Sequence, residues 1–86
     1  MDWQKCMNQA IDYIEGNLSD EIEYSMAAQY MNCSVWEFQR IFSFMAQVPL
    51  SEYIRRRRLT LAAHDIQAGN DKIIDVALRY GYECVK

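Results

Sequence analysis

The 86-residue sequence has little glycine and proline, with three Gly and one Pro. So few turn residues favour helices that are joined by short connections. No apolar stretch approaches the roughly 20 residues that a bilayer-spanning helix needs. The start, MDWQKCMNQ, also lacks the basic-then-apolar profile of a signal peptide. We therefore expect a cytoplasmic protein without a membrane partner.

Cysteine and histidine are scarce as well. Cys6, Cys33 and Cys84 are odd in number and lack C-x-x-C spacing, which predicts reduced thiols. His64 has no Cys or His partner at the spacing of a metal site. The sequence also shows no nucleophile beside a base and no glycine-rich phosphate loop. We expect neither a cofactor nor a metal, and we do not expect an enzyme.

Basic residues are rare in the first part of the chain. Residues 1–37 hold seven acidic residues and one basic residue, whereas residues 38–86 hold eight basic and five acidic residues. The net charge of −3 by itself argues against a nucleic-acid partner. The uneven distribution is nevertheless compatible with one basic face that meets phosphates, although the overall acidity should weaken nonspecific binding.

Apolar residues recur at helical spacing and predict an all-α fold. The expected helices cover residues 3–17, 24–31, 35–45, 50–68 and 73–80. Between the second and third helices, Asn32 suits a left-handed turn and Ser34 suits an N-cap. Glu37, three residues after Ser34, completes an S-x-x-E capping box, so the third helix should begin at Val35. Asp71 is the expected cap of the fifth helix.

The third predicted helix separates two kinds of side chain. Four apolar residues should point into the core, namely Phe38, Ile41, Phe42 and Met45. Four residues should face outward, namely Trp36, Gln39, Arg40 and Ser43. A core position for Trp36 and an ordinary solvated role for Arg40 are the alternatives. The polar neighbours of Trp36 favour the outward orientation.

Residues 55–58 are four consecutive arginines. On a helix they point in four directions about 100° apart, so they do not form one basic patch. We expect intrahelical ion pairs such as that between Glu52 and Arg56, and an aliphatic stem of Arg57 or Arg58 over the core. Contact with a DNA phosphate by one of the four is the alternative, and Arg55 is our candidate for it.

An internal repeat relates residues 24–32 to residues 73–81, at an offset of 49 residues. The matched pairs are Tyr24 with Ile73, Ala27 with Val76, Ala28 with Ala77, Met31 with Tyr80, and Asn32 with Gly81. A helix, a left-handed turn and the start of another helix are therefore encoded twice. We expect a first helix-turn-helix unit at residues 1–48, a linker helix at 49–69 and an incomplete second unit at 70–86.

Three motifs in this order resemble the AraC family of bacterial transcription regulators, nearest to the subgroup of MarA and Rob, with a truncation in the second helix-turn-helix. The motifs are S-x-W-x-x-Q-R-x-F from Ser34, Y-I-x-x-R-R-L-x-x-A from Tyr53, and I-x-D-V-A-x-x-Y-G-Y-E from Ile73. The resemblance implies two homeodomain-like helix-turn-helix units that are joined by a long helix. Each unit places its second helix in a major groove of double-stranded DNA.

The resemblance also implies roles for single residues. Trp36, Gln39 and Arg40 correspond to base-contacting positions, and Ser34 corresponds to a phosphate contact. Arg suits guanine, Gln suits adenine, and an aromatic ring suits a thymine methyl group. Ser43 stands where the family usually has a basic residue, so it is a candidate phosphate contact without the usual charge. Gln47 replaces a common Gly, which predicts an altered turn.

We therefore expect sequence-specific DNA binding as part of an AraC-type activator that contacts RNA polymerase. The alternative is a protein interaction or self-association module with little or no DNA binding. In that case apolar residues of the fifth helix, such as Ile73, Val76 and Tyr80, lack cover. They would then drive a homodimer, formed by exchange of the C-terminal segment, or leave a partly disordered end after Gly69.

Overall fold

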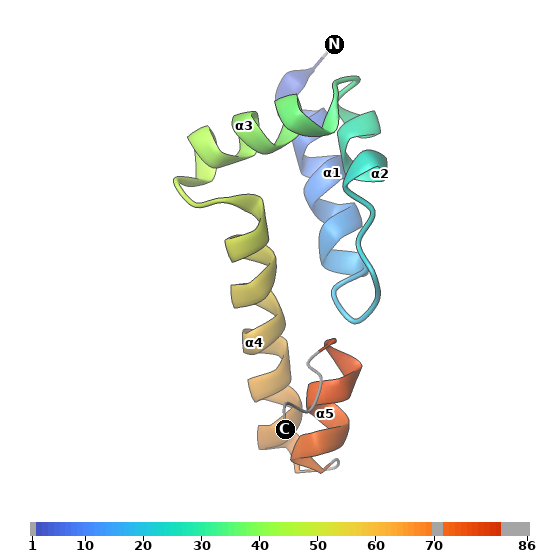
Figure 1. Ribbon diagram of the computed structural model, residues 1–86, viewed down its shortest axis with the longest axis vertical. Coiled ribbons are helices and arrows are strands. Elements are labelled where there is room, and N and C mark those ends of the chain that lie inside the picture. The colour runs from blue at the N-terminus through green and yellow to red at the C-terminus, as the bar shows by residue number, and fades with distance from the viewer. Residues whose placement is uncertain (1, 70–71, 82–86) are drawn as a thin grey trace.

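The computed structural model describes residues 2–69 and 72–81, and these residues form helices without any strand. The helices are α1 (Trp3–Gly16), α2 (Tyr24–Tyr30), α3 (Val35–Ala46), α4 (Leu50–Ala68) and α5 (Ile73–Arg79). The all-α prediction is confirmed, and each helix begins at its predicted residue and ends within one residue of its predicted end. Helices α1 and α2 lie side by side, α3 crosses their upper end, and α5 lies at the far end of α4 (Figure 1).

The turn between α2 and α3 has the predicted conformation. Asn32 is left-handed, with φ of 52°, and the Cys33 N–H donates to the Ala28 carbonyl at 3.3 Å. The Ser34 hydroxyl accepts from the Glu37 N–H at 3.1 Å, and the Glu37 carboxylate accepts from the Ser34 N–H at 3.1 Å. Two N–H groups at the start of α3 are thus satisfied reciprocally, which fixes where this helix begins.

The turn after α3 is a second left-handed turn. Gln47 has φ of 60° and donates its N–H to the Ser43 carbonyl at 2.9 Å. This conformation is the one that a glycine adopts most readily after a helix. Gln47 thus adopts a left-handed conformation that glycine adopts more readily, and an altered turn relative to the family stays a prediction.

One hydrophobic core holds α1, α2, α3 and the start of α4 together. Its buried residues are Met7, Ala10, Ile14, Leu18, Ala27, Ala28, Met31, Phe38, Phe42, Leu50 and Ile54. Two small side chains, Ala27 and Ala28, let α2 pack closely on its neighbours. The inward orientation of Phe38 and Phe42 is confirmed, since they are 0% and 3% exposed. The core therefore fixes which side of α3 faces solvent.

The predicted burial of Met45 is wrong, and that of Ile41 is only partly met. Met45 is 48% exposed, and Ile41 is half-buried. The C-terminal end of α3 extends beyond α1 before the chain turns into α4 (Figure 1). Met45 lies in that last turn, where the helical periodicity continues but the neighbouring helices that would cover the side chain have ended.

Polar contacts fasten α4 to the end of α1. The Arg57 guanidinium donates to both oxygens of the Glu15 carboxylate, at 2.8 and 3.0 Å, and the Tyr53 hydroxyl donates to the same carboxylate at 2.8 Å. Arg58 donates to the carbonyls of Leu18 and Asp20, each at 2.9 Å. Burial and the hydrogen bond to Glu15 raise the pKa of Tyr53 to about 12. These contacts set the direction in which α4 leaves the first three helices.

The second copy of the repeat has the geometry of the first. Ala27 and Val76 are both 0% exposed, and Met31 and Tyr80 are both 8% exposed. Each copy ends in a left-handed residue, which is Asn32 after α2 and Gly81 after α5, the latter with φ of 85°. The repeat therefore extends to the left-handed turn and to the burial of these two pairs. It does not extend to the burial of the other pairs, because Ala28 is buried and Ala77 half-buried, and Tyr24 is half-buried and Ile73 exposed.

Two of the three residues expected to lack cover on α5 are buried instead. Val76 packs against α4, and the Tyr80 hydroxyl donates to the Asp65 carboxylate at 2.8 Å. Arg79 donates to Asp65 at 2.9 Å. The expectation was wrong for Val76 and Tyr80, because α4 itself covers them, whereas Ile73 is 69% exposed as expected. Capping by Asp71 and exchange of the C-terminal segment lie outside the described residues.

Candidate nucleic-acid interface

The solvent side of α3 carries an exposed strip formed by Trp36, Arg40 and Phe44, which lie at successive spacings of four residues. Trp36 is 65% exposed, which excludes the alternative that it is a core residue. The Arg40 guanidinium lies over the Trp36 ring, 4.7 Å from its centroid. A cation held on an aromatic face is thus presented to solvent on the side of α3 opposite Phe38 and Phe42.

The sequence prediction missed Phe44. Its side chain is 86% exposed, and it continues the line of Trp36 and Arg40 by one more turn. The signal was present in the sequence, because residues four apart on a helix share a face. It was missed because hydrophobic residues near it were assigned to the core.

Gln39 and Ser43 lie at the edge of the exposed strip rather than in it. Both are half-buried. The Ser43 hydroxyl donates to the Val48 carbonyl at 3.4 Å, beyond the end of α3. A hydroxyl has one proton to donate, so Ser43 has to release Val48 before it can donate to a phosphate.

The start of α3 is an exposed helix N-terminus, but it already holds a carboxylate. Hydrogen bonds from the backbone and the hydroxyl of Ser34 hold the pKa of Glu37 below its usual value. The Glu37 carboxylate therefore stays ionised beside the N–H groups that an incoming phosphate would use. Ser34 is exposed beside it, so a phosphate here meets both a hydroxyl and a negative charge.

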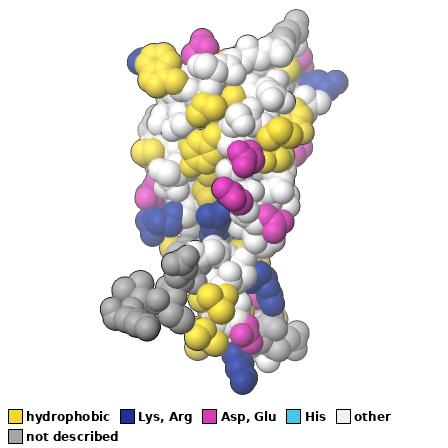
Figure 2. Space-filling model, turned by 45° about the vertical axis from the view of Figure 1, so that its right-hand side comes forward, with side chains coloured by type: hydrophobic (Ala, Val, Ile, Leu, Met, Phe, Trp, Pro, Cys, Tyr) yellow, Lys and Arg dark blue, Asp and Glu magenta, His cyan; other side chains and the backbone are white. Residues whose placement is uncertain are grey.

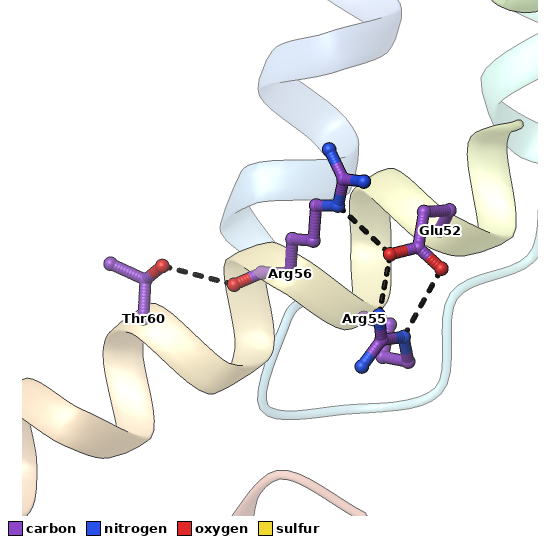
Figure 3. A network of polar contacts seen from close by, with 4 residues as sticks. All are labelled: Glu52, Arg55, Arg56 and Thr60. Atoms are coloured by element: carbon purple, nitrogen blue, oxygen red, sulfur yellow. Dashed lines mark hydrogen bonds and ion pairs between the residues drawn. The ribbon is translucent and has the colours of Figure 1, made fainter. Parts of the chain in front are cut away.

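The four arginines of residues 55–58 divide into two pairs with different partners. Arg55 and Arg56 both form ion pairs with Glu52, one turn earlier on α4 (Figure 3). Hydrogen bonds from Arg55 and then Arg56 lower the pKa of Glu52. Arg57 and Arg58 face α1 and its following loop. The predicted pair between Glu52 and Arg56 is confirmed, and Arg55 remains an exposed cation, with 56% of its side chain accessible.

Three acidic residues gather in the connection between α1 and α2. They are Asp20, Glu21 and Glu23, and all three are exposed. Figure 2 shows acidic side chains over the middle of one face of the molecule. Such a face repels phosphates, whereas on α3 itself the acidic residue is Glu37 in the first turn.

Other kinds of site find no support in the described part of the chain. Residues 2–69 and 72–81 contain no group of three or more His, Cys, Asp and Glu that could hold a metal ion. Burial and the charge of Glu37 raise the pKa of the half-buried Cys33 thiol, which disfavours a reactive thiolate. None of the helices in these residues is long and apolar enough to span a membrane.

Comparison with known proteins agrees with this geometry. A family profile described as a helix-turn-helix domain matches residues 27–86. The chain is 38% identical to the HTH-type transcriptional activator AarP of Providencia stuartii over 77 residues, which are 90% of this chain and 57% of AarP. It is 32% identical to the regulatory protein SoxS of Salmonella typhimurium over 82 residues, which are 95% of this chain and 77% of SoxS.

The multiple antibiotic resistance protein MarA of Salmonella typhimurium is 33% identical over 73 residues, which are 85% of this chain and 58% of MarA. The chain thus spans less than two thirds of the length of AarP and of MarA. The family match covers more than half of the chain, and it includes α3 with its exposed strip. The chain belongs to the AraC family of helix-turn-helix, DNA-binding transcription regulators.

Proposed function

We propose that α3 is the recognition helix of this chain and lies in the major groove of its target DNA. The observation that carries this proposal is the exposed Trp36 and Arg40 pair on a helix whose opposite face is buried by Phe38 and Phe42. The turn and cap before α3 fix the orientation of that helix on α2, as a helix-turn-helix requires. Residues 1–48 form the first unit, residues 49–69 the linker helix and residues 70–86 the second unit in this proposal.

Three residues contact bases in this arrangement. Arg40 donates two hydrogen bonds to one guanine, and Gln39 pairs with the edge of an adenine from beside the strip. Trp36 packs on a thymine methyl group or on the sugar wall of the groove. The contact between Arg40 and Trp36 supports this assignment, because it places the guanidinium beside an exposed aromatic ring on the solvent side of α3 before DNA arrives.

Phosphate contacts fix the position of α3 in the groove without reading sequence. We assign them to Ser34 at the start of α3, to Ser43 near its end, and to Arg55 on α4. Arg55 is the strongest of the three, since it is exposed and charged, although its guanidinium is shared with the Glu52 carboxylate. Ser34 shares its place with the Glu37 carboxylate, and Ser43 must first release Val48, so each contributes less than a cation would.

A mobility-shift selection from a random duplex pool tests this function. The chain should enrich a defined sequence, and its affinity for that sequence should fall linearly on a logarithmic scale as salt rises. Bound DNA without any enriched sequence would contradict base recognition by α3. No binding at low salt would contradict DNA binding by this chain altogether.

The cellular role follows from the relatives. AarP is named a transcriptional activator. We propose that this chain likewise acts in the bacterial cytoplasm, where the DNA is, and that it raises transcription by contacting RNA polymerase beside a promoter. The role is one of binding rather than catalysis.

A second candidate function is self-association, which the exposed apolar side chains of α4 and α5 favour. Five large apolar side chains on α4 and α5 are exposed, namely Leu59, Ile66, Ile73, Ile74 and Leu78. Leu59, Ile66 and Ile73 line a shallow apolar hollow above Val76. Sedimentation equilibrium should then show a dimer that Ile73→Asp dissociates. A concentration-independent monomer would contradict this candidate.

A further inference from the structure

Phe44 is the residue of the exposed strip to which the proposed function gives no role. It is 86% exposed, a larger fraction than any other large hydrophobic side chain in the described part of the chain. Trp36, the other aromatic residue of the strip, is 65% exposed. A ring that is exposed to this extent adds little buried area to the packing of α3, and together with Trp36 it gives the strip two exposed aromatic rings.

The spacing along α3 brings Phe44 within reach of the same DNA that Trp36 and Arg40 contact. Phe44 follows Arg40 by one turn and Trp36 by two turns. At about 1.5 Å per residue, the rise from Trp36 to Phe44 is about 12 Å. The major groove is about 12 Å wide. A helix that contacts the groove through Trp36 and Arg40 therefore holds Phe44 inside or at the wall of that groove.

The chemistry of the groove then limits what a phenyl ring can recognise. Base edges in the major groove present hydrogen-bonding groups, and the apolar group among them is the C5-methyl group of thymine. We propose that Phe44 packs on a thymine methyl group and selects a T·A pair beside the guanine that Arg40 reads. This inference rests on the proposed function, and it adds one position to the target sequence.

A protein partner is the competing occupant. Phe44 lines a shallow hollow together with Trp3, Arg40, Ile41 and Met45. Arg40 belongs both to this hollow and to the exposed strip, so a protein seated there would compete with DNA for Arg40. DNA is the favoured occupant, because Arg40 places a cation and several hydrogen-bond donors beside Phe44.

The test is a double-mutant cycle between the side chain and the base. The selected duplex is synthesised with each thymine near the Arg40 guanine replaced in turn by uracil, which removes the methyl group and keeps the pairing. Affinities of the chain and of Phe44→Ala are then measured by fluorescence anisotropy. Met45→Ala is the matched control, since Met45 is exposed on the same turn but off the strip. Thermal unfolding checks that both variants fold.

At one of these positions, replacement of thymine by uracil should weaken binding by the unaltered chain about fourfold, as expected for the loss of one buried methyl group. The same replacement should have no effect on Phe44→Ala, and Met45→Ala should respond like the unaltered chain. Equal responses of the chain and Phe44→Ala at every thymine would overturn the inference and leave the proposed function intact. Absence of specific DNA binding by the unaltered chain would overturn the proposed function, and the inference with it.

Discussion

The guanidinium of Arg40 lies 4.7 Å from the centroid of the Trp36 ring, one helical turn away on the exposed side of α3. An exposed cation–π contact stabilises its geometry by about 0.5 to 1 kcal/mol. Arg40 therefore loses less side-chain freedom on binding than a fully mobile arginine, which favours the bound state. The pair acts as one preformed element on the surface of the helix.

Replacement of Arg40 should reduce both affinity and base preference. We expect Arg40→Ala to weaken binding to the selected site by about 1 to 3 kcal/mol and to relax the preference for guanine at one position. Arg40→Lys is the control, because it keeps the charge but loses the planar pair of donors. It should keep most of the salt dependence and lose the guanine preference. If both variants selected the same DNA sequence as the unaltered chain, Arg40 would not be a base-contacting residue.

Two substitutions of Ser34 separate its contribution to folding from its contribution to DNA contact. Ser34→Ala removes the cap of α3 and should lower the free energy of unfolding by about 1 kcal/mol, whereas glycine at an N-cap costs only a few tenths of a kcal/mol. Both variants lack the hydroxyl. If the hydroxyl contacts a phosphate, Ser34→Gly should bind DNA as weakly as Ser34→Ala while unfolding close to the unaltered chain. Full DNA affinity of Ser34→Gly would show that Ser34 is only a cap.

Glu15 makes the free energy of unfolding depend on pH in the acid range. Its hydrogen bond from Arg57 is the main cause that holds the pKa of Glu15 below its usual value. A carboxylate with a lowered folded-state pKa contributes stability that is complete above the unfolded-state pKa. That contribution is lost as pH falls through the lower folded-state pKa.

We therefore expect Glu15→Gln to cost about 1 kcal/mol near neutral pH, because the ion pair is partly exposed, and to flatten the loss of stability in acid. Denaturant unfolding across an acid pH series measures both effects. Asp12→Asn, which removes an exposed carboxylate from the same helix, is the matched control for the loss of one negative charge. An identical acid slope in the chain and in Glu15→Gln would contradict this role of Glu15.

Arg55 and Arg56 form a matched pair for the phosphate contact on α4. Both are exposed and both pair with Glu52, but they project from adjacent positions of the helix (Figure 3). Arg55→Ala should reduce the slope of log affinity against log salt by about 0.9, the value for one lost phosphate contact. Arg56→Ala should leave the slope unchanged. If the two variants showed the same slope of log affinity against log salt, Arg55 would not be the residue that contacts a phosphate.

The sequence predicted best those features that depend on near neighbours. Asn32 and Gly81 were placed in left-handed turns and Ser34 at a cap, because these conformations follow from the residue itself and from one turn of helix. The burial of Phe38 and Phe42 followed from the helical spacing of the apolar residues in α3.

Features that depend on distant segments were not predictable in this way. The contact between Glu15 and Arg57 joins residues that are 42 positions apart. From the sequence alone, Arg57 could have paired with any of many carboxylates. Met45 continues the apolar period of α3, but no helix covers it there, while α4 covers Val76 and Tyr80 on α5. Trp36 and Arg40 were predicted at the candidate site, and Phe44 was not.

Methylation interference on the selected duplex tests most directly whether α3 occupies the major groove. Methylation of guanine at N7 blocks the major-groove edge that a bidentate arginine contacts. We expect N7 methylation of one guanine in the site to prevent binding by the unaltered chain and to have no effect on binding by Arg40→Ala. Interference confined to the minor-groove N3 of adenine, or the same guanine pattern in both proteins, would show that α3 does not read the major groove through Arg40.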